Sequence, residues 1–544
     1  MKKGLLFFAL VAISFSVSAY DFENAGIYYN IIGNGNVEVT RDTSNPYSGA
    51  VTIPATVTDN TITYNVTAIG DSAFSGCRGM TSINIPDGLT SIGLRSFHKC
   101  SGLTSLTIPN SVTEIKKLAF RNCSGLTSVT LPDSLTYFDY GIFAFCTNLS
   151  SIAIPSKVTS IGEFAFDSCV SLTSIVLPGA VTEIKRWAFQ NCINLTSISL
   201  PDCVNQIDSG IFNNCRNLTS ITLPEGLTSI GYATFYDCEN LTSIDIPSTV
   251  NFIDDFAFRN CSSLTSVTLP EGLSSIGYQL FLNCKKLTSI NIPSSVEFID
   301  TYAFGNCSSL TSVTQHEGLT SIGYGAFAFC NSLNSINIPS TVEFIDNYAF
   351  AYCGRLDSIT IPEGVPYIGE GVFTDCSSLV SIDIPSTVTY IDSFAFENCT
   401  SLTSITLPAG VTSIGDAAFN NCSSLENIYC DATTPPSLSS NTFSSYEATL
   451  HVPANSVSDY QEAEYWQNFY IVPTETSVEY CDLTDRGVRY FDGIIYNENE
   501  LNLTVYNMNG QAITTGNGDI DIRNFPNGMY VVTDNKGGKT KIMR

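Results

Sequence analysis

Hydrophobic and polar residues alternate along the central part of the chain in a unit that repeats every 23 residues. In one copy, Leu264, Val267 and Leu269 are separated by polar positions, and Pro270 follows. Apolar alternation with a period of two is typical of a half-buried strand. Proline ends the strand because it has no N–H to donate. The pattern then predicts a second short extended piece around Ile276 and a tight turn that carries a phenylalanine and a cysteine.

Sixteen copies of this unit follow one another without a slip in register. Cysteines recur every 23 residues from Cys77 to Cys422, and a phenylalanine lies three positions before each, from Phe74 to Phe419. A leucine lies three positions after each cysteine, with Met80 in the first copy. One copy cannot bury its apolar residues alone, whereas stacked copies bury them as continuous columns. The sequence therefore predicts a parallel β-rich repeat solenoid with coils roughly 4.8 Å apart.

The repeated unit Leu-Thr-Ser-Ile-x-Ile-Pro-x-x-Val-x-x-Ile-Gly-x-x-Ala-Phe-x-x-Cys resembles the BspA-like leucine-rich repeats of bacterial surface proteins. The resemblance covers residues 66–430. It implies a leucine-rich repeat solenoid that takes part in adhesion to host proteins or to other cells, and it implies no reaction.

The two ends of the repeat array are predicted to be capped, because a solenoid needs a polar cover over its terminal coils. Residues 20–65 carry strand-like runs without the full repeat and form the predicted N-terminal cap. Residues 431–476 form the predicted C-terminal cap, with a short helix over residues 457–469. Trp466 and Phe469 are expected to anchor that helix.

Residues 1–19 are predicted to be a cleaved secretory signal peptide. Lys2 and Lys3 precede an apolar stretch that is too short to span a membrane, and small residues end it at Ala19. No later apolar segment is long enough for a membrane helix, so no transmembrane segment is expected in the mature chain.

Residues 477–544 differ in style from the repeats and are predicted to form a small all-β sandwich. The stretches 505–510 and 527–531 and the final Lys-Ile-Met-Arg resemble the C-terminal sorting domain of the type IX secretion pathway. The resemblance implies transport across an outer membrane, with cleavage and attachment at the cell surface. The alternative is a small β-sandwich without a sorting role.

The charge of the chain excludes some classes of partner. The formal net charge is −27, from 51 acidic and 24 basic residues. Nucleic acids and anionic membranes both require neutralisation by Lys and Arg, so neither is expected as a partner.

The nineteen cysteines leave three interpretations open. Buried free thiols are favoured, because cysteine is a small hydrophobe and the repeated side chains point the same way into the core. Occasional disulfides remain open, since the expected coil spacing lies within bridging range. Metal binding is disfavoured because no histidine lies at ligand spacing. Cys203, Cys430 and Cys481 lie outside the register, and Cys430 is expected in the core.

No catalytic or metal site and no cofactor is predicted. His98, His316 and His451 lie far apart along the chain and are interpreted as exposed and unpaired. Four aspartates recur every 46 residues, at Asp254, Asp300, Asp346 and Asp392. An evenly spaced row lacks the contrasting environments of an acid and a base. A turn role is therefore favoured, with each carboxylate bonded to nearby backbone amides.

The 46-residue alternation also places extra aromatic residues outside the core register. These ligand-contact candidates form four pairs: Phe252 with Phe256, Phe298 with Tyr302, Phe344 with Tyr348, and Tyr390 with Phe394. Exposed aromatics are natural contact residues for proteins or sugars. The alternative is that these side chains pack over one another across paired coils and seal one edge. The polar outward side of the strands, from Thr222 to Asn337, offers a second surface.

The sequence thus predicts a non-catalytic, secreted protein of the outer membrane or cell surface. It would bind host extracellular proteins or other cell surfaces through an extended repeat surface. Two alternatives stay open: a structural envelope protein that associates with itself, and a glycan-binding helper to secreted enzymes.

Overall fold

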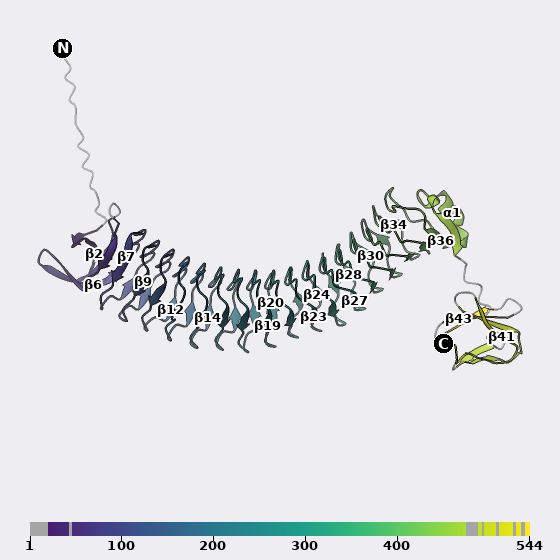
Figure 1. Cartoon of the computed structure of the whole chain (residues 1–544), viewed down its shortest axis with the longest axis horizontal. Coiled ribbons are helices and arrows are strands. Elements are labelled where there is room, and N and C mark those ends of the chain that lie inside the picture. The colour runs from purple at the N-terminus through teal and green to yellow at the C-terminus, as the bar shows by residue number, and fades with distance from the viewer. Residues whose placement is uncertain are drawn as a thin grey trace, which may run out of the picture. The chain divides into compact units, whose positions relative to one another are not determined.

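The chain folds into two compact units in a computed structural model (Figure 1). Unit 1 comprises Met1–Ile405, Ser413–Leu425 and Leu438–Ser445, and unit 2 comprises Thr406–Thr412, Glu426–Ser437 and Tyr446–Arg544. The structure describes residues 20–42, 46–474, 488–491, 494–507, 511–525, 529–534 and 539–543. The predicted signal peptide and Cys481 lie outside the described residues.

Unit 1 begins with a cap of six strands. These are β1 (Phe22–Asn24), β2 (Ile27–Gly33), β3 (Asn36–Thr40), β4 (Gly49–Thr52), β5 (Thr56–Asp59) and β6 (Ile62–Ile69). β1, β2 and β3 pair antiparallel, and β3 then pairs parallel to β6. β6 pairs parallel to β8 (Ser91–Ile92), so hydrogen bonds continue from the cap into the coils.

Most of the following coils carry one strand on each of two faces (Figure 1), and the first face has no strand between residues 130 and 197. The first face holds β7 (Met80–Asn84), β9 (Ser105–Thr107), β11 (Ser128–Thr130), β15 (Ser197–Ser199), β17 (Ser220–Thr222), β19 (Ser243–Asp245), β21 (Ser266–Thr268), β23 (Ser289–Asn291), β25 (Ser312–Thr314), β27 (Ser335–Asn337), β29 (Ser358–Thr360), β31 (Ser381–Asp383) and β33 (Ser404–Leu407). The second face holds β8 (Ser91–Ile92), β10 (Glu114–Ile115), β12 (Tyr137–Phe138), β13 (Ser160–Ile161), β14 (Glu183–Ile184), β16 (Gln206–Ile207), β18 (Ser229–Ile230), β20 (Phe252–Ile253), β22 (Ser275–Ile276), β24 (Phe298–Ile299), β26 (Ser321–Ile322), β28 (Phe344–Ile345), β30 (Tyr367–Ile368), β32 (Tyr390–Ile391) and β34 (Ser413–Ile414).

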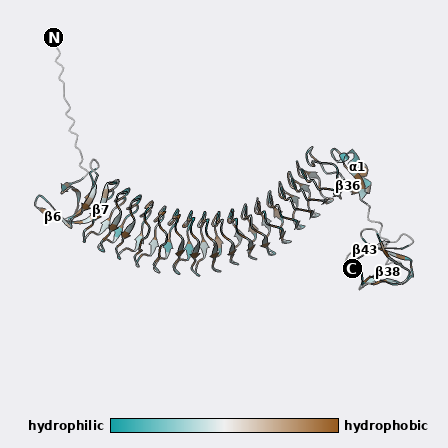
Figure 2. Cartoon of the chain, viewed as in Figure 1, coloured by the Kyte–Doolittle hydropathy of each residue, from teal (hydrophilic) through white to brown (hydrophobic). Residues whose placement is uncertain are grey.

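The strands of successive coils pair in parallel at a shift of 23 residues, for example Phe298 with Ser321. Apolar and polar residues alternate along the coils (Figure 2), because a residue that points inward is followed by one that points outward. The predicted parallel solenoid of 23-residue coils is confirmed.

The turns of unit 1 contain a continuous column of phenylalanine rings. From Phe74 to Phe443 each ring stacks on the next, and ring centroids lie 5.1 Å apart between Phe74 and Phe97 and 5.8 Å apart between Phe350 and Phe373. All of the rings are buried. The column explains why phenylalanine stands at the same place in every coil.

The cysteine ladder runs beside this column. The Cys100 Sγ–H donates to the carbonyl oxygen of Phe74, and the same contact recurs in every coil up to Cys422, which donates to Phe396. The ladder cysteines are buried and free, which confirms the interpretation as buried thiols. Burial raises the pKa of Cys77 to about 11 and also raises the pKa of the thiols farther along the ladder.

We expect iodoacetamide to alkylate Cys203 in the native protein and to leave the ladder cysteines unmodified. Cys203 is exposed, whereas a buried and protonated ladder thiol supplies no thiolate to react. Peptide mass spectrometry after labelling at pH 8, with and without urea, measures the modification of each cysteine. Labelling of ladder cysteines in the native protein, at the rate seen in urea, would contradict this arrangement.

Unit 2 contains three parallel strands and short helices. These are β35 (Asn427–Cys430), β36 (Thr449–Pro453), η1 (Ala454–Ser456), α1 (Val457–Glu462), η2 (Trp466–Asn468) and β37 (Tyr470–Thr474). The predicted helix over residues 457–469 is wrong in its length. The α-helix ends at Glu462 because Ala463 is extended and Tyr465 has a positive φ of 66°. In the described residues, no helix is long and apolar enough to cross a membrane.

The predicted anchors of unit 2 are confirmed. Trp466 and Phe469 are buried, and the Trp466 indole N–H donates to the carbonyl oxygen of Pro436 at 2.7 Å. Cys430 is buried as expected and lies 3.1 Å from the Tyr460 hydroxyl.

Unit 2 ends in a small antiparallel β region, as predicted. Its strands are β38 (Val488–Phe491), β39 (Ile494–Asn497), β40 (Leu503–Tyr506), β41 (Ala512–Gly516), β42 (Ile520–Asp521), β43 (Met529–Asp534) and β44 (Lys539–Met543). They form two sheets, with the orders β38-β39-β42 and β41-β40-β43-β44. Leu503, Val505, Ile520 and Val532 belong to their common core.

Candidate binding surface

Aromatic side chains form a row along the second face of unit 1, with exposed phenylalanines followed by two half-buried tyrosines. We define the outer aromatic row as Phe252, Phe298, Phe344, Tyr367 and Tyr390. Each is the first residue of a two-residue strand, where the side chain before the buried isoleucine must point outward. The phenylalanines are 54%, 41% and 38% exposed.

The rings in the first part of the row are separated by serines, whereas the rings in its last part contact one another. Ser275 and Ser321 separate the three phenylalanines along the chain of coils, and Phe298 pairs with a serine on either side. The Phe344 ring then meets Tyr367 edge-on at 6.2 Å, and Tyr367 stacks on Tyr390 at 4.8 Å. Sequence analysis missed Tyr367, because it breaks the 46-residue alternation that identified the others.

The other four candidates form an inner aromatic row, defined as Phe256, Tyr302, Tyr348 and Phe394. These residues are half-buried and have positive φ angles between 51° and 60°. Tyr302 and Tyr348 contact Tyr324 between them, with ring centroids 5.4 and 5.5 Å apart. Packing across coils, the alternative interpretation of these aromatics, therefore describes the inner row and the last part of the outer row, but not Phe252 and Phe298.

Glycine provides the space for the two tyrosine rings of the inner row. A Cβ atom placed on Gly325 would lie 2.5 Å from the ring of Tyr302, and one on Gly371 would collide with the ring of Tyr348. Both glycines have positive φ angles, 57° and 58°. Each of these two tyrosine rings thus lies over a glycine of the next coil, whereas Gln279 and Ala417 stand at that position after Phe256 and Phe394.

A second exposed aromatic pair lies one position before the cysteines, where sequence analysis proposed nothing. Phe329 and Tyr352 stack at 4.4 Å and are 42% and 39% exposed. Most other coils carry asparagine here, and these side chains form a hydrogen-bonded ladder, as between Asn283 and Asn306 at 2.7 Å. An aromatic residue at a position that is usually asparagine could have identified this pair from the sequence.

The first face is mainly polar. The row from Thr222 to Asn337 is exposed, as expected. Val176 interrupts the polar positions with an 82% exposed apolar side chain. Hollows of 610 and 780 Å³ lie on either side of Val176, where the first face lacks strands between β11 and β15.

The recurring aspartates have the predicted turn role. Asp300 Oδ1 accepts a hydrogen bond from the backbone N–H of Thr301 at 2.6 Å. Asp254, Asp346 and Asp392 each make the equivalent bond to the following residue.

The interpretation of the histidines as exposed is wrong for His451 and His98. His451 is half-buried, its Nε2 lies 3.0 Å from Asn427 Oδ1, and its ring stacks on Tyr429. It is paired because parallel strands β35 and β36 place these residues side by side. His316 is exposed, and His98 is half-buried.

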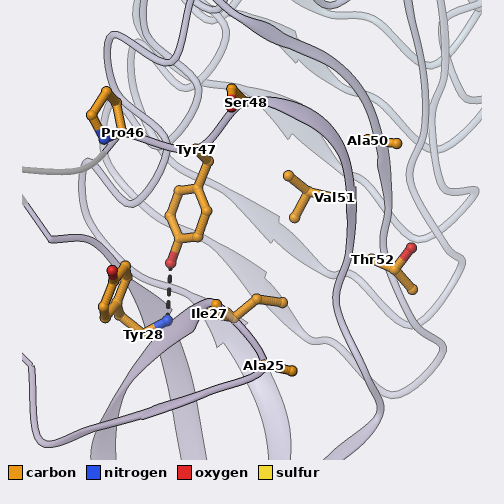
Figure 3. Close-up of a pocket in the computed structure, with 10 residues that line it drawn as sticks. Ala25, Ile27, Tyr28, Pro46, Tyr47, Ser48, Ala50, Val51 and Thr52 are labelled. Carbon is orange, nitrogen blue, oxygen red and sulfur yellow. Dashed lines mark hydrogen bonds between the residues drawn. The ribbon is translucent and has the colours of Figure 1, made fainter.

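A hollow of 420 Å³ lies in the N-terminal cap, between β2 and the segment that leads into β4 (Figure 3). The Tyr47 hydroxyl accepts a hydrogen bond from the Tyr28 N–H at 3.0 Å and donates to the carbonyl oxygen of Thr40 at 2.7 Å. Burial raises the pKa of Tyr47, so the phenol stays protonated. The Tyr47 hydroxyl therefore uses both its donor and its acceptor capacity within the cap, and its role is structural.

The described residues offer no metal-binding cluster of three or more His, Cys, Asp or Glu side chains.

Comparison with known proteins identifies relatives of the repeat array. The family model of the BspA type leucine rich repeat region matches residues 55–169, 138–253, 228–357 and 343–466. Leucine-rich repeat solenoids of this kind are generally non-enzymatic scaffolds. A leucine-rich repeat protein from Bacteroides ovatus is 29% identical, with a TM-score of 0.56 over 84% of this chain and 100% of that chain. A leucine rich cell surface protein from Faecalibacterium prausnitzii is 27% identical over 75% of this chain and 94% of that chain, with a TM-score of 0.39. No match is found among curated proteins.

Proposed function

Because the chain belongs to the BspA-type leucine-rich repeat family, we propose that it is a non-catalytic surface protein that binds host or microbial proteins through its outer aromatic row. The proposal places it outside the cell, in line with the signal peptide predicted at residues 1–19 and the sorting domain that residues 477–544 resemble.

The exposure of the outer aromatic row carries this proposal. Large aromatic side chains that stand in water are costly on a surface with no partner, and they are the residues that contribute most at protein interfaces. Their backbone is fixed by parallel pairing to the coils on either side, so little conformational entropy is lost when a partner binds.

The repeats supply conservative substitutions for a test. Serine occupies the same position in the alternate coils, at Ser275 and Ser321, so the triple variant Phe252→Ser, Phe298→Ser and Phe344→Ser keeps the strand pattern. A matched control removes exposed apolar side chains elsewhere, with Val176→Thr and Val380→Thr, since threonine stands at these positions in other coils.

We expect the mature protein to bind selectively to members of a panel of immobilised extracellular matrix proteins, measured by surface plasmon resonance. The serine variant should lose more than about tenfold in affinity, because an aromatic contact at an interface contributes about 2 kcal/mol. The threonine control should bind like the parent protein.

Three outcomes would overturn the proposal. Equal losses in both variants would show that the row is not the contact surface. Binding to a parallel panel of glycans, without any protein, would favour a glycan-binding role. Concentration-dependent assembly without any partner, seen by sedimentation, would favour a structural envelope protein.

A further inference from the structure

Basic residues are concentrated in two adjacent turns of this acidic chain. Residues 93–101 and 116–124 contain five Lys or Arg residues and no Asp or Glu. We call these residues the basic patch: Arg95, Lys99, Lys116, Lys117 and Arg121. Residues 261–405, in the later coils, contain 13 acidic and 3 basic residues. The positive charge is therefore local, within a molecule whose net charge is −27.

The coil stack brings these charges together. The Arg95 N–H donates to the carbonyl oxygen of Lys117 at 3.2 Å, and the Lys99 N–H donates to that of Arg121 at 2.9 Å. Between them the Phe97 and Phe120 rings stack at 5.2 Å, which gives the spacing of the coils. Like charges one coil apart repel each other, so this arrangement costs stability unless an anion covers it.

Four of the five side chains are exposed, and the fifth is held in place. Arg121 is half-buried, and its guanidinium carbon lies 5.1 Å from the centre of the Phe145 ring. Its Nε atom is buried and has no hydrogen-bond partner. Burial lowers the pKa of His98, in the same turn, and the charges of Lys99, Arg121 and Arg95 lower it further.

The bordering carboxylates are engaged elsewhere. Asp71 accepts the backbone N–H of Leu94 at 2.8 Å, and Asp139 accepts that of Tyr140 at 2.7 Å. Asp167 accepts hydrogen bonds from Ser168 and Asn191. Within the described part of the chain, none of the five patch residues forms an ion pair.

Some other cations of unit 1 have carboxylate partners. Arg186 lies 2.8 Å from Glu163, and Arg216 lies 3.6 Å from Glu239. The basic patch therefore differs from the rest of unit 1 in its density of positive charge.

We propose that the basic patch binds a linear polyanionic polysaccharide, one that carries sulfate or carboxylate groups along its chain. Such a ligand presents successive anionic groups to successive coils, and its binding releases counterions. A second copy of this chain fits less well, because two molecules of charge −27 repel each other. The inference is independent of the outer aromatic row, since it uses other residues on other coils.

The test uses the full mature protein and immobilised heparin, with neutral dextran as the uncharged counterpart. The patch variant is Arg95→Ser with Lys99→Asn, because Ser72 and Asn122 occupy these positions in neighbouring coils. The matched control is Lys285→Ser with Lys286→Ser, a change that places serine where Ser262 and Ser263 stand one coil earlier. Each variant removes two positive charges.

We expect heparin binding at 50 mM salt and no dextran binding. The patch variant should lose about tenfold or more in affinity, and its plot of log affinity against log salt concentration should be shallower by about 2. The control should keep both the affinity and the slope. Circular dichroism and equal urea midpoints establish that both variants are folded.

A parent protein that fails to bind heparin at 50 mM salt overturns the proposal. So do equal losses in both variants, which would indicate a diffuse charge effect. Self-association at low salt that the patch variant abolishes, without heparin binding, would assign the patch to a second copy of the chain.

Discussion

Replacing Phe304 by alanine should lower the free energy of unfolding by about 3–5 kcal/mol, the usual cost of removing a buried aromatic ring from a core. The Phe304 side chain is fully buried between Phe281 and Phe327, whose ring centroids lie 5.5 and 5.3 Å away. Its removal leaves a cavity that the coils cannot close, because backbone hydrogen bonds on both sides fix their spacing. Urea denaturation followed by circular dichroism measures the change.

The same coil contains the control for this experiment. Phe298 is 41% exposed on the second face, and its replacement by alanine should change the stability by less than about 1 kcal/mol. The two variants remove the same atoms from one coil, so they differ only in burial. Equal effects of Phe304→Ala and Phe298→Ala would contradict the stacked column.

Replacing Gly325 by alanine should cost about 2–4 kcal/mol, a large effect for a single added methyl group. About 1 kcal/mol comes from the positive φ angle of 57°. A further 1–3 kcal/mol, roughly, comes from overpacking, since the new Cβ would lie 2.5 Å from the Tyr302 ring. Denaturation in urea, under the conditions used for Phe304, provides the measurement.

Two further variants separate these causes. Gly76 has a φ of 80° and no atom within 4 Å of an added Cβ, so Gly76→Ala should show the backbone cost of about 1 kcal/mol alone. The double variant Tyr302→Ala with Gly325→Ala should be more stable than the sum of the single effects predicts, because the ring that collides is gone. Strict additivity of the two substitutions would exclude the contact between ring and glycine.

The 23-residue periodicity was enough to predict the coil. Phe304, Cys307 and Leu310 recur in every copy because each must lie over its equivalent in the neighbouring coil, and this constraint is visible in a single sequence. The turn role of Asp300 was also predictable, since an acceptor that follows a strand satisfies backbone N–H groups of the turn.

The depth of the aromatic residues was not predictable. Phe298 and Tyr302 are four positions apart in one coil, and the repeat spacing alone does not predict how exposed either side chain is. The difference arises because the Tyr302 ring lies over Gly325 of the next coil, whereas Phe298 pairs with Ser321 and points outward. The early end of α1 at Glu462 depends on the backbone conformation of Tyr465. Helix propensities do not predict that conformation. The net charge did not predict the basic patch, because it sums the charges of all coils.

The fit of the Tyr302 and Tyr348 rings over glycines limits how the gene can change in length. Loss of a segment of 23 codons around Gly325 would place Tyr302 directly beneath Tyr348, with two large rings competing for one space. Loss or duplication of 46 codons restores the alternation of ring and glycine. Unequal recombination in this part of the array should therefore be tolerated in steps of two coils, and natural variants should differ by even numbers of repeats here.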